Sequence, residues 1–160
     1  MGLIAFIKEA GERLLGKDVA AAASDPAKSE SANRAAATAI ENHIGKFNFT
    51  VTALTVTFNA ASGTARVFGV AKDQETKEKV ILAAGNVEGV AAVEDMMTVD
   101  LSAPEAQYYS VVKGDTLSKI AKQFYGNAND YMRIFEANKP MLTHPDKIYP
   151  GQNLRIPSKA

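Results

Sequence analysis

Few residues in this sequence of 160 residues could carry out chemistry on a bound substrate. Cysteine is absent, which excludes disulfide bonds, thiolate metal sites and cysteine nucleophiles. The two histidines, His43 and His144, lie far apart in the sequence and do not suggest a zinc site. The sequence has neither a Gly-x-Ser-x-Gly nucleophile elbow nor a glycine-rich phosphate loop. We therefore predict that the protein is not an enzyme.

The acidic side chains support the same prediction. Glu94, Asp95 and Asp100 fall on one predicted strand at adjacent or even offsets, which is typical of a solvated edge rather than of an acid–base pair. Basic and acidic residues number 18 each, whereas nucleic-acid-binding proteins normally carry a basic excess. We expect no nucleic-acid partner.

The overall composition predicts a folded protein, since 46% of the residues are hydrophobic and 22% are charged. No stretch reaches the roughly 18 apolar residues that a membrane-spanning helix needs. Residues 1–18 lack the basic start and the unbroken apolar run of a signal peptide. We expect a monomer that stays in the cytoplasm and does not insert into a membrane.

Residues 1–30 are predicted to hold a helix and a connection. The apolar residues of the helix recur at the spacing of an amphipathic stripe, at Leu3, Phe6, Ile7, Ala10 and Leu14. Residues 17–30 are alanine-rich with one proline and predict a connecting segment. A second helix is expected over residues 31–46, where apolar residues again share one side.

From residue 51 the hydrophobic pattern changes from helical to alternating. Residues 51–58 and 64–71 predict a hairpin of two strands, residues 73–84 a helix, and residues 93–101 a further strand. Residues 31–101 therefore have the order α-β-β-α-β, which predicts an α+β domain with helices on one face of a small sheet.

A proline-containing linker, residues 102–107, separates this domain from a second one over residues 108–160. The second domain has the order β-α-α-β. Its characteristic motifs are Gly114–Asp115–Thr116–Leu117, Ile120–Ala121, Tyr125–Gly126 and the run from Ile148 to Pro157. Through these motifs it resembles a LysM domain.

The first domain resembles a BON domain in its Gly63 and Gly69 strand and in its turn from Gly85 to Val90. A short N-terminal segment followed by BON and LysM domains is similar in order to the bacterial potassium-binding proteins of the Kbp family. The resemblance implies a cytoplasmic K⁺ sensor or buffer that becomes more compact when the ion binds. The expected fold class is α+β, with two small domains after the N-terminal helix.

The resemblance also implies that K⁺ is held by main-chain carbonyl oxygens. Neutral carbonyls can replace the water around a large monovalent ion, whereas carboxylate clusters favour divalent ions. Carried over by position, the candidate ligands are the carbonyls of Ile7, Ala10, Glu12, Gly85, Val87 and Val90. A glycine at a helix end can adopt positive φ and fold carbonyls around a point. The residues alone favour a simple helix cap and turn in the segment from Gly85 to Gly89.

The LysM resemblance supports an alternative from another class, an adaptor of the cell envelope that binds peptidoglycan. LysM domains typically bind N-acetylglucosamine polymers in a groove between two loops. In this sequence the groove would involve Gly114, Asp115, Thr116, Leu117, Lys147, Ile148 and Tyr149. The same residues also fit purely structural roles, because Asp115 and Thr116 can cap a helix.

Overall fold

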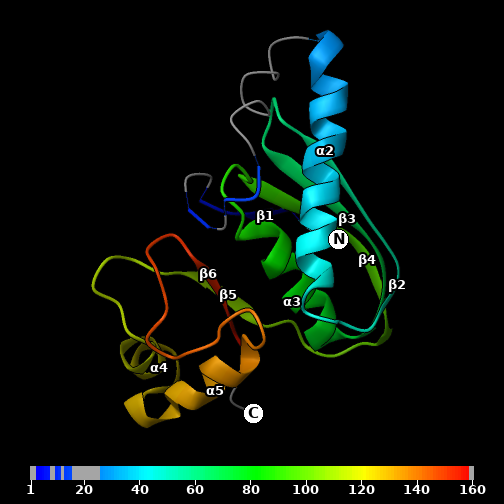
Figure 1. The fold of residues 1–160 in the computed structure, drawn as a ribbon. Helices are drawn as coiled ribbons and strands as arrows, with labels where there is room; N and C mark the ends of the chain where they lie inside the picture. The colour runs from blue at the N-terminus through cyan, green and yellow to red at the C-terminus, as the bar shows by residue number, and fades with distance from the viewer. Residues whose placement is uncertain (1–2, 8–9, 12, 16–25, 159–160) are drawn as a thin grey trace.

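The computed structural model describes residues 3–7, 10–11, 13–15 and 26–158. The protein has an α+β fold, as the sequence predicts, with a four-stranded sheet in its N-terminal half and a two-stranded sheet in its C-terminal half. Figure 1 shows the two halves side by side. In the part of the chain that the structure describes, no helix is long and apolar enough to cross a membrane.

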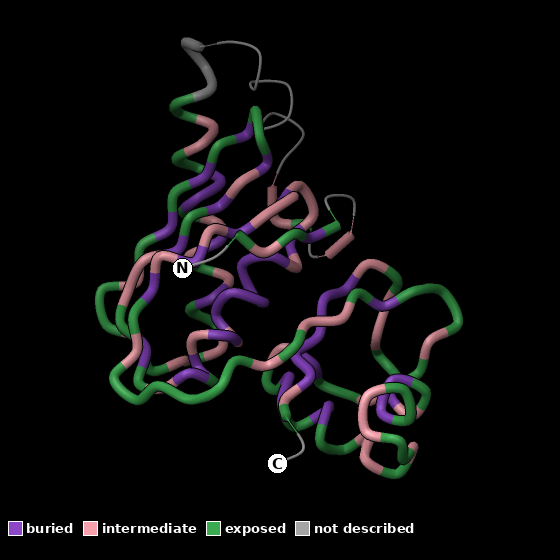
Figure 2. The backbone as a smooth tube through the Cα atoms, turned by 180° about the vertical axis from the view of Figure 1, so that it is seen from behind, coloured by how far each residue is buried: buried purple, intermediate pink, exposed green. Residues whose placement is uncertain are grey.

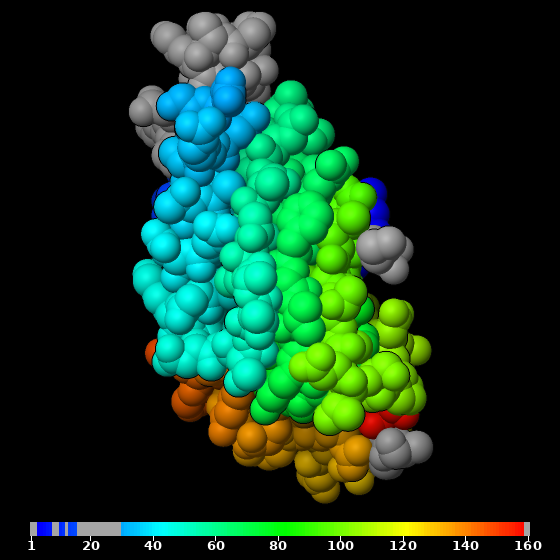
Figure 3. Space-filling view, turned by 90° about the vertical axis from the view of Figure 1, so that its right-hand side faces the viewer, coloured from blue at the N-terminus to red at the C-terminus, as the bar shows by residue number. Residues whose placement is uncertain are grey.

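The N-terminal half is built on a sheet with the strand order β1-β4-β3-β2. Its elements are β1 (Leu3–Ala5), α2 (Pro26–Gly45), β2 (Val51–Asn59), β3 (Thr64–Asp73), α3 (Gln74–Gly85) and β4 (Ala92–Leu101). β2 and β3 form an antiparallel hairpin, whereas β3 and β4 run parallel because α3 crosses over between them. Figure 3 shows β2, β3 and β4 lying side by side across one face of the molecule.

The N-terminal segment forms a strand at Leu3–Ala5, and the prediction of an amphipathic helix there is wrong. β1 pairs with the edge of β4. Burial follows a two-residue period, since Ile4 and Phe6 pack on the core while Leu3 and Ile7 are 67% and 45% exposed. Pairing with a sheet edge satisfies the main-chain polar groups without a helix, so tertiary contacts override the helical spacing.

Helix α2 begins at Pro26, inside the stretch that was expected to be a connection, and the helix predicted over 31–46 is therefore longer. Proline suits the first helical turn because the N–H that it lacks would have no partner there. Alanine, which is frequent in this stretch, is the strongest helix former. Ile40 and Ile44 lie on the predicted apolar side and are buried. Residues 16–25 of the expected connection lie outside the described residues.

Asp95 faces the core, and the prediction that it lies on a solvated edge is wrong. Its Oδ2 lies 3.0 Å from Lys77 Nζ, and its Oδ1 accepts a hydrogen bond from the Met97 N–H at 2.9 Å. Because Lys77 extends from α3, this ion pair fastens the helix to β4. Glu94, the neighbour of Asp95, points the other way and pairs with Arg66 at 2.8 Å.

The C-terminal half packs two helices on a two-stranded antiparallel sheet. Its elements are β5 (Gln107–Ser110), α4 (Leu117–Tyr125), the 3₁₀ helix η1 (Ala128–Asp130), α5 (Tyr131–Ala137) and β6 (Asn153–Ile156). Ile120, Ile134 and Leu154 centre its own hydrophobic core. Gly126 ends α4 with a left-handed φ of 76°, as expected for a glycine after a helix.

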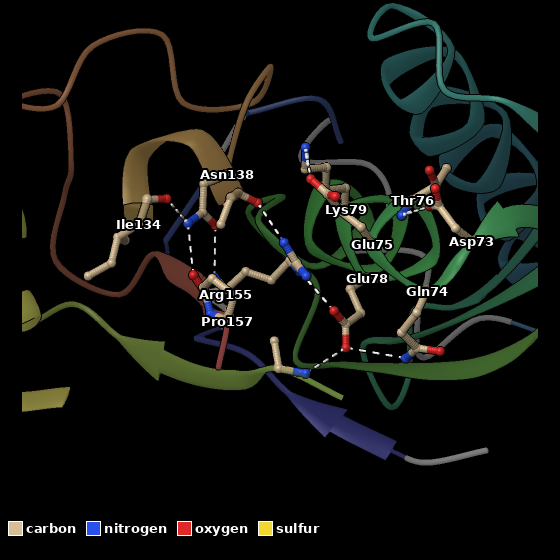
Figure 4. Close-up of polar contacts among 12 residues, drawn as sticks. Asp73, Gln74, Glu75, Thr76, Glu78, Lys79, Ile134, Asn138, Arg155 and Pro157 are labelled. Carbon is tan, nitrogen blue, oxygen red and sulfur yellow. Dashed lines mark hydrogen bonds and ion pairs between the residues drawn. The ribbon is translucent and has the colours of Figure 1, made fainter. Parts of the chain in front are cut away.

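A buried ion pair joins the two halves. Arg155 Nε in β6 lies 2.8 Å from Glu78 Oε1 in α3, and the two side chains are 8% and 2% exposed. Gln74 Nε2 and the Ala106 N–H donate to Glu78 Oε2, and Arg155 Nη1 donates to Ala137 O (Figure 4). Each charge is thus partnered, so α3 and β6 are held in one arrangement. Figure 2 shows how deeply α3 is buried between its neighbours.

Candidate functional site

The two segments implied by the sequence as ligand donors lie against each other. One is the N-terminal segment, which here means the described residues among 3–15. The other is the 86–91 loop, which connects α3 to β4. The Phe6 N–H donates to Ala91 O at 2.8 Å, which continues the pairing of β1 beyond its last residue. The loop is therefore lined by the N-terminal segment.

Gly85, the last residue of α3, supports this contact by its lack of a side chain. A methyl group there would collide with the ring of Phe6, which is 7% exposed. At Gly85 itself the chain is still helical. Positive φ occurs instead at Gly89, where it is 104°. Gly85 is thus needed for space rather than for a special backbone conformation.

Gly11 brings the main chains of the two segments together. A methyl group at Gly11 would lie 2.5 Å from the carbonyl carbon and oxygen of Asn86 and 2.8 Å from the Val87 nitrogen. Its φ of 109° also belongs to the region that favours glycine. No side chain separates the two backbones at this point, so carbonyls from both segments can approach one ion.

Two further contacts follow along the same line. Arg13 Nε lies 3.2 Å from Glu88 Oε2, in a solvent-exposed ion pair. Leu15 packs beside Gly89, where a methyl group would lie 3.2 Å from Leu15 Cδ1. Gly11, Arg13 and Leu15 therefore follow the 86–91 loop in order, from Asn86 to Gly89.

The structure brings five of the six candidate K⁺ ligands to this region, and Glu12 lies outside the described residues. Ile7 O accepts a hydrogen bond from the Ala10 N–H at 3.1 Å, and Val87 O accepts one from the Val90 N–H at 3.0 Å. A carbonyl oxygen has two lone pairs and can still face a cation. The role of these carbonyls in ion binding stays a prediction.

The electrostatics at the end of α3 favour a cation. The last carbonyls of a helix lack partners within it, and the helix dipole makes that end negative. The Asn86 N–H closes the helix on Leu82 O at 2.9 Å. Among the described residues, no group of three or more His, Cys, Asp or Glu side chains could hold a metal ion. The neutral oxygens available here fit a large monovalent cation.

The C-terminal half also reaches this region, through residues that the sequence did not single out. A methyl group at Gly151 would lie 2.6 Å from Ala10 Cβ. Asn86 Nδ2 donates to Asn153 O, and the Asn153 N–H donates to Asn86 Oδ1, both at 2.9 Å. Asn153 Nδ2 donates to Ala5 O at 2.9 Å. Three parts of the chain, distant in sequence, thus meet at one point.

The first loop of the alternative glycan site uses its side chains for local contacts. Asp115 Oδ2 accepts from the Tyr109 hydroxyl at 2.6 Å and from the Val112 N–H at 2.9 Å. The hydrogen bond from Tyr109 lowers the pKa of Asp115, and the same bond raises the pKa of Tyr109. Thr116 caps α4 by accepting from the Lys119 N–H at 3.1 Å, and Leu117 is buried.

The second loop of that site lies partly against the N-terminal half. In the first loop, the Gly114 carbonyl accepts a hydrogen bond from Lys119 Nζ at 3.1 Å. In the second loop, Ile148 packs on the C-terminal core. Lys147 and Tyr149 line a cavity of about 240 Å³ between the halves. The rest of its lining is His43, Phe47, Leu82, Ala83, Asn86, Met141, Leu142, Thr143 and Gln152. Two of the three residues predicted in this loop thus face the other half.

By its fold and its family match, this chain is an α+β protein with a C-terminal LysM domain. Residues 109–157 match the LysM domain family. The chain is 46% identical over 159 residues to the potassium binding protein Kbp of Escherichia coli O6:H1 (strain CFT073), a match that covers 99% of this chain and 100% of that protein. The chain belongs to the Kbp family.

Two other relatives share only part of the chain. An uncharacterized protein of Deinococcus radiodurans is 49% identical over 49 residues, which are 31% of this chain and 19% of that protein. The uncharacterized protein YqbP of Bacillus subtilis (strain 168) is 38% identical over 65 residues, which are 35% of this chain and 29% of that protein.

Proposed function

We propose that this protein binds K⁺ through main-chain carbonyls of the N-terminal segment and of the α3 end with its 86–91 loop. The observation that carries the proposal is the direct main-chain contact at Gly11, with Asn86 and Val87 on the other side. The relative named potassium binding protein covers the same chain from end to end. The ligands would be the carbonyls of Ile7, Ala10, Glu12, Gly85, Val87 and Val90.

The chain's own residues prepare such a site in two ways. Gly11 and Gly85 remove side chains from the contact, so that backbone meets backbone and the Phe6 ring covers the end of α3. The negative end of the α3 dipole adds attraction for a cation, and the Glu88 carboxylate of the same loop is paired with Arg13.

The proposed response is a shift between conformations. Carbonyls of the N-terminal segment and of the loop can share one ion only in the closed arrangement, in which the segment lies on the loop. An ion that binds this arrangement better than an open one favours it in proportion to the difference in affinity. The protein would therefore become more compact with K⁺ and act in the cytoplasm as a sensor or buffer, a binding role rather than catalysis.

Thermal unfolding of the purified protein in KCl, NaCl and choline chloride at equal ionic strength tests the proposal. A ligand at about 100 times its dissociation constant stabilises the native state by about 2.7 kcal/mol. For a protein of this size we expect a midpoint several degrees higher in KCl than in the other salts. Equal midpoints at all KCl concentrations contradict K⁺ binding.

Peptidoglycan binding is a second candidate because residues 109–157 match the LysM family. The local hydrogen bonds of Asp115 and Thr116 leave the backbone of their loop in a fixed shape that could line a groove. Lys147 and Tyr149, however, line the cavity between the halves, so a long glycan would need the halves to separate. Cosedimentation with insoluble peptidoglycan at matched KCl and NaCl tests this function. No cosedimentation in either salt would contradict it.

A further inference from the structure

We infer that Asn153, in the LysM domain, is a positioning residue for the proposed K⁺ site and couples ion affinity to docking of the two halves. The inference rests on the proposed function. Asn153 is 3% exposed and is the first residue of β6. It contacts both segments whose carbonyls would bind the ion, although its own carbonyl would not be a ligand.

The main chain of Asn153 holds the 86–91 loop. Its N–H and its carbonyl oxygen form a reciprocal pair of hydrogen bonds with the side-chain amide of Asn86, both at 2.9 Å. Asn86 lies between Gly85 and Val87, two of the candidate ligands. The orientation of the peptide groups on either side of Asn86 is therefore fixed from the other half of the protein.

The side chain of Asn153 holds the N-terminal segment. Its Nδ2 donates to Ala5 O at 2.9 Å, two residues before the candidate ligand Ile7. Its Oδ1 accepts from the Ser110 hydroxyl, which fixes the amide so that the nitrogen faces Ala5. Beside it, Gly151 packs against Ala10 and Ile7. The LysM domain thus touches both halves of the site through one short run of residues.

The chemistry of this position requires an amide. A donor must face the Ala5 carbonyl and an acceptor must face the Ser110 hydroxyl, and asparagine supplies both. Aspartate has the same shape but presents a charged acceptor to both partners. The contact with Ser110 would survive in Asn153→Asp, whereas the contact with the Ala5 carbonyl would become repulsive.

The test measures K⁺ affinity of the full-length chain by isothermal titration with KCl, for the wild type, Asn153→Asp and Thr116→Ala. Thr116→Ala is the matched control because it removes a helix cap within the LysM domain without contacting either carbonyl segment. The loss of one hydrogen bond and the new repulsion predict a dissociation constant raised about tenfold or more in Asn153→Asp. We expect an unchanged dissociation constant in Thr116→Ala.

Each outcome decides the inference. If the wild type binds K⁺ and Asn153→Asp binds it equally well, the inference is wrong while the proposed function stands. If Thr116→Ala weakens binding as much as Asn153→Asp does, the effect is one of general stability and the inference is also wrong. If the wild type does not bind K⁺, the proposed function fails and the inference fails with it.

A milder variant serves if Asn153→Asp does not fold, as judged by circular dichroism in NaCl. Ser110→Ala leaves Asn153 in place and removes only the hydroxyl that orients its amide. We expect a dissociation constant raised about twofold to fivefold, since one neutral hydrogen bond is lost. Unchanged affinity in this variant would overturn the inference.

Discussion

Two loops of this protein contain glycine beside a helix end, and they are stabilised in opposite ways. The 112–116 loop, between β5 and α4, is held by its own neighbours through Asp115 and Thr116. The 86–91 loop is held by distant parts of the chain, through Gly11 on one side and Asn153 on the other. The first keeps its shape whenever the LysM domain is folded, whereas the second depends on the arrangement of the whole protein.

This difference indicates which loop is suited to sensing an ion. A loop whose hydrogen bonds are all local responds little to changes elsewhere, which suits a rigid binding surface. A loop whose partners lie on other segments can gain or lose them together, so a ligand that bridges those segments shifts the whole arrangement. The proposed K⁺ site lies at the second kind of loop.

The largest expected effect comes from separating the halves without touching either loop. Arg155→Met leaves the Glu78 carboxylate buried and unpaired, which should lower the free energy of unfolding by about 3–5 kcal/mol. The matched control is Arg66→Met, which breaks an exposed pair with Glu94 and should cost less than about 1 kcal/mol. Urea denaturation measures both, and similar losses would contradict a structural role for the buried pair.

The next effect isolates the contact between the N-terminal segment and the loop. Gly11→Ala places a methyl group against the main chain of Asn86 and demands a φ that alanine rarely adopts. We expect most of the difference in melting temperature between KCl and NaCl to disappear. Gly45→Ala is the control, since a methyl group there meets nothing within 4 Å. A full KCl effect in Gly11→Ala would exclude this contact from the site.

A smaller effect is expected in the locally held loop. Thr116→Ala removes the cap of α4 and should lower stability by about 1 kcal/mol in either salt. The difference in melting temperature between KCl and NaCl should stay as in the wild type, because this loop makes none of the contacts that the ion would bridge. Loss of that difference would mean that the two loops are coupled.

The smallest expected effect is a change of stability with pH. The hydrogen bond from Tyr109 holds the pKa of Asp115 below its ordinary value of 3.8. Because the pKa is lower in the folded state, the associated stability is present above the unfolded pKa and is lost as the pH falls through the folded one. Tyr109→Phe should therefore destabilise the protein slightly at neutral pH and less in acid. Urea denaturation of the wild type and of Tyr109→Phe at neutral pH and near pH 3 measures this difference. An equal loss of stability at both pH values would contradict the prediction.

Local patterns in the sequence predicted the order of strands and helices from residue 31 onward. They failed at the N-terminal segment, because the apolar spacing of Leu3, Phe6 and Ile7 fits a helix while an available sheet edge at β4 imposes a strand. They also placed Asp95 at a solvated edge, since the sequence does not show that Lys77 would reach it from α3.

The parts of the candidate site that the sequence could not predict are those that join distant residues. Asn86 and Asn153 are 67 positions apart, and Asn153 and Ala5 are 148 apart, so no local pattern relates them. Gly85 is a candidate from the sequence as a carbonyl ligand, not for the space that its missing side chain leaves. Its actual role depends on the Phe6 ring, which only the folded chain brings to it.

Hydrogen–deuterium exchange of the full-length protein in KCl and in NaCl tests the central claim most directly. If an ion bridges the N-terminal segment and the 86–91 loop, KCl should slow exchange in both, and at the Asn153 N–H that donates to Asn86, by the same factor, since one opening exposes all three. The 112–116 loop should exchange alike in the two salts. Unchanged exchange at the N-terminal segment and at the 86–91 loop, or protection confined to the 112–116 loop, would contradict the account.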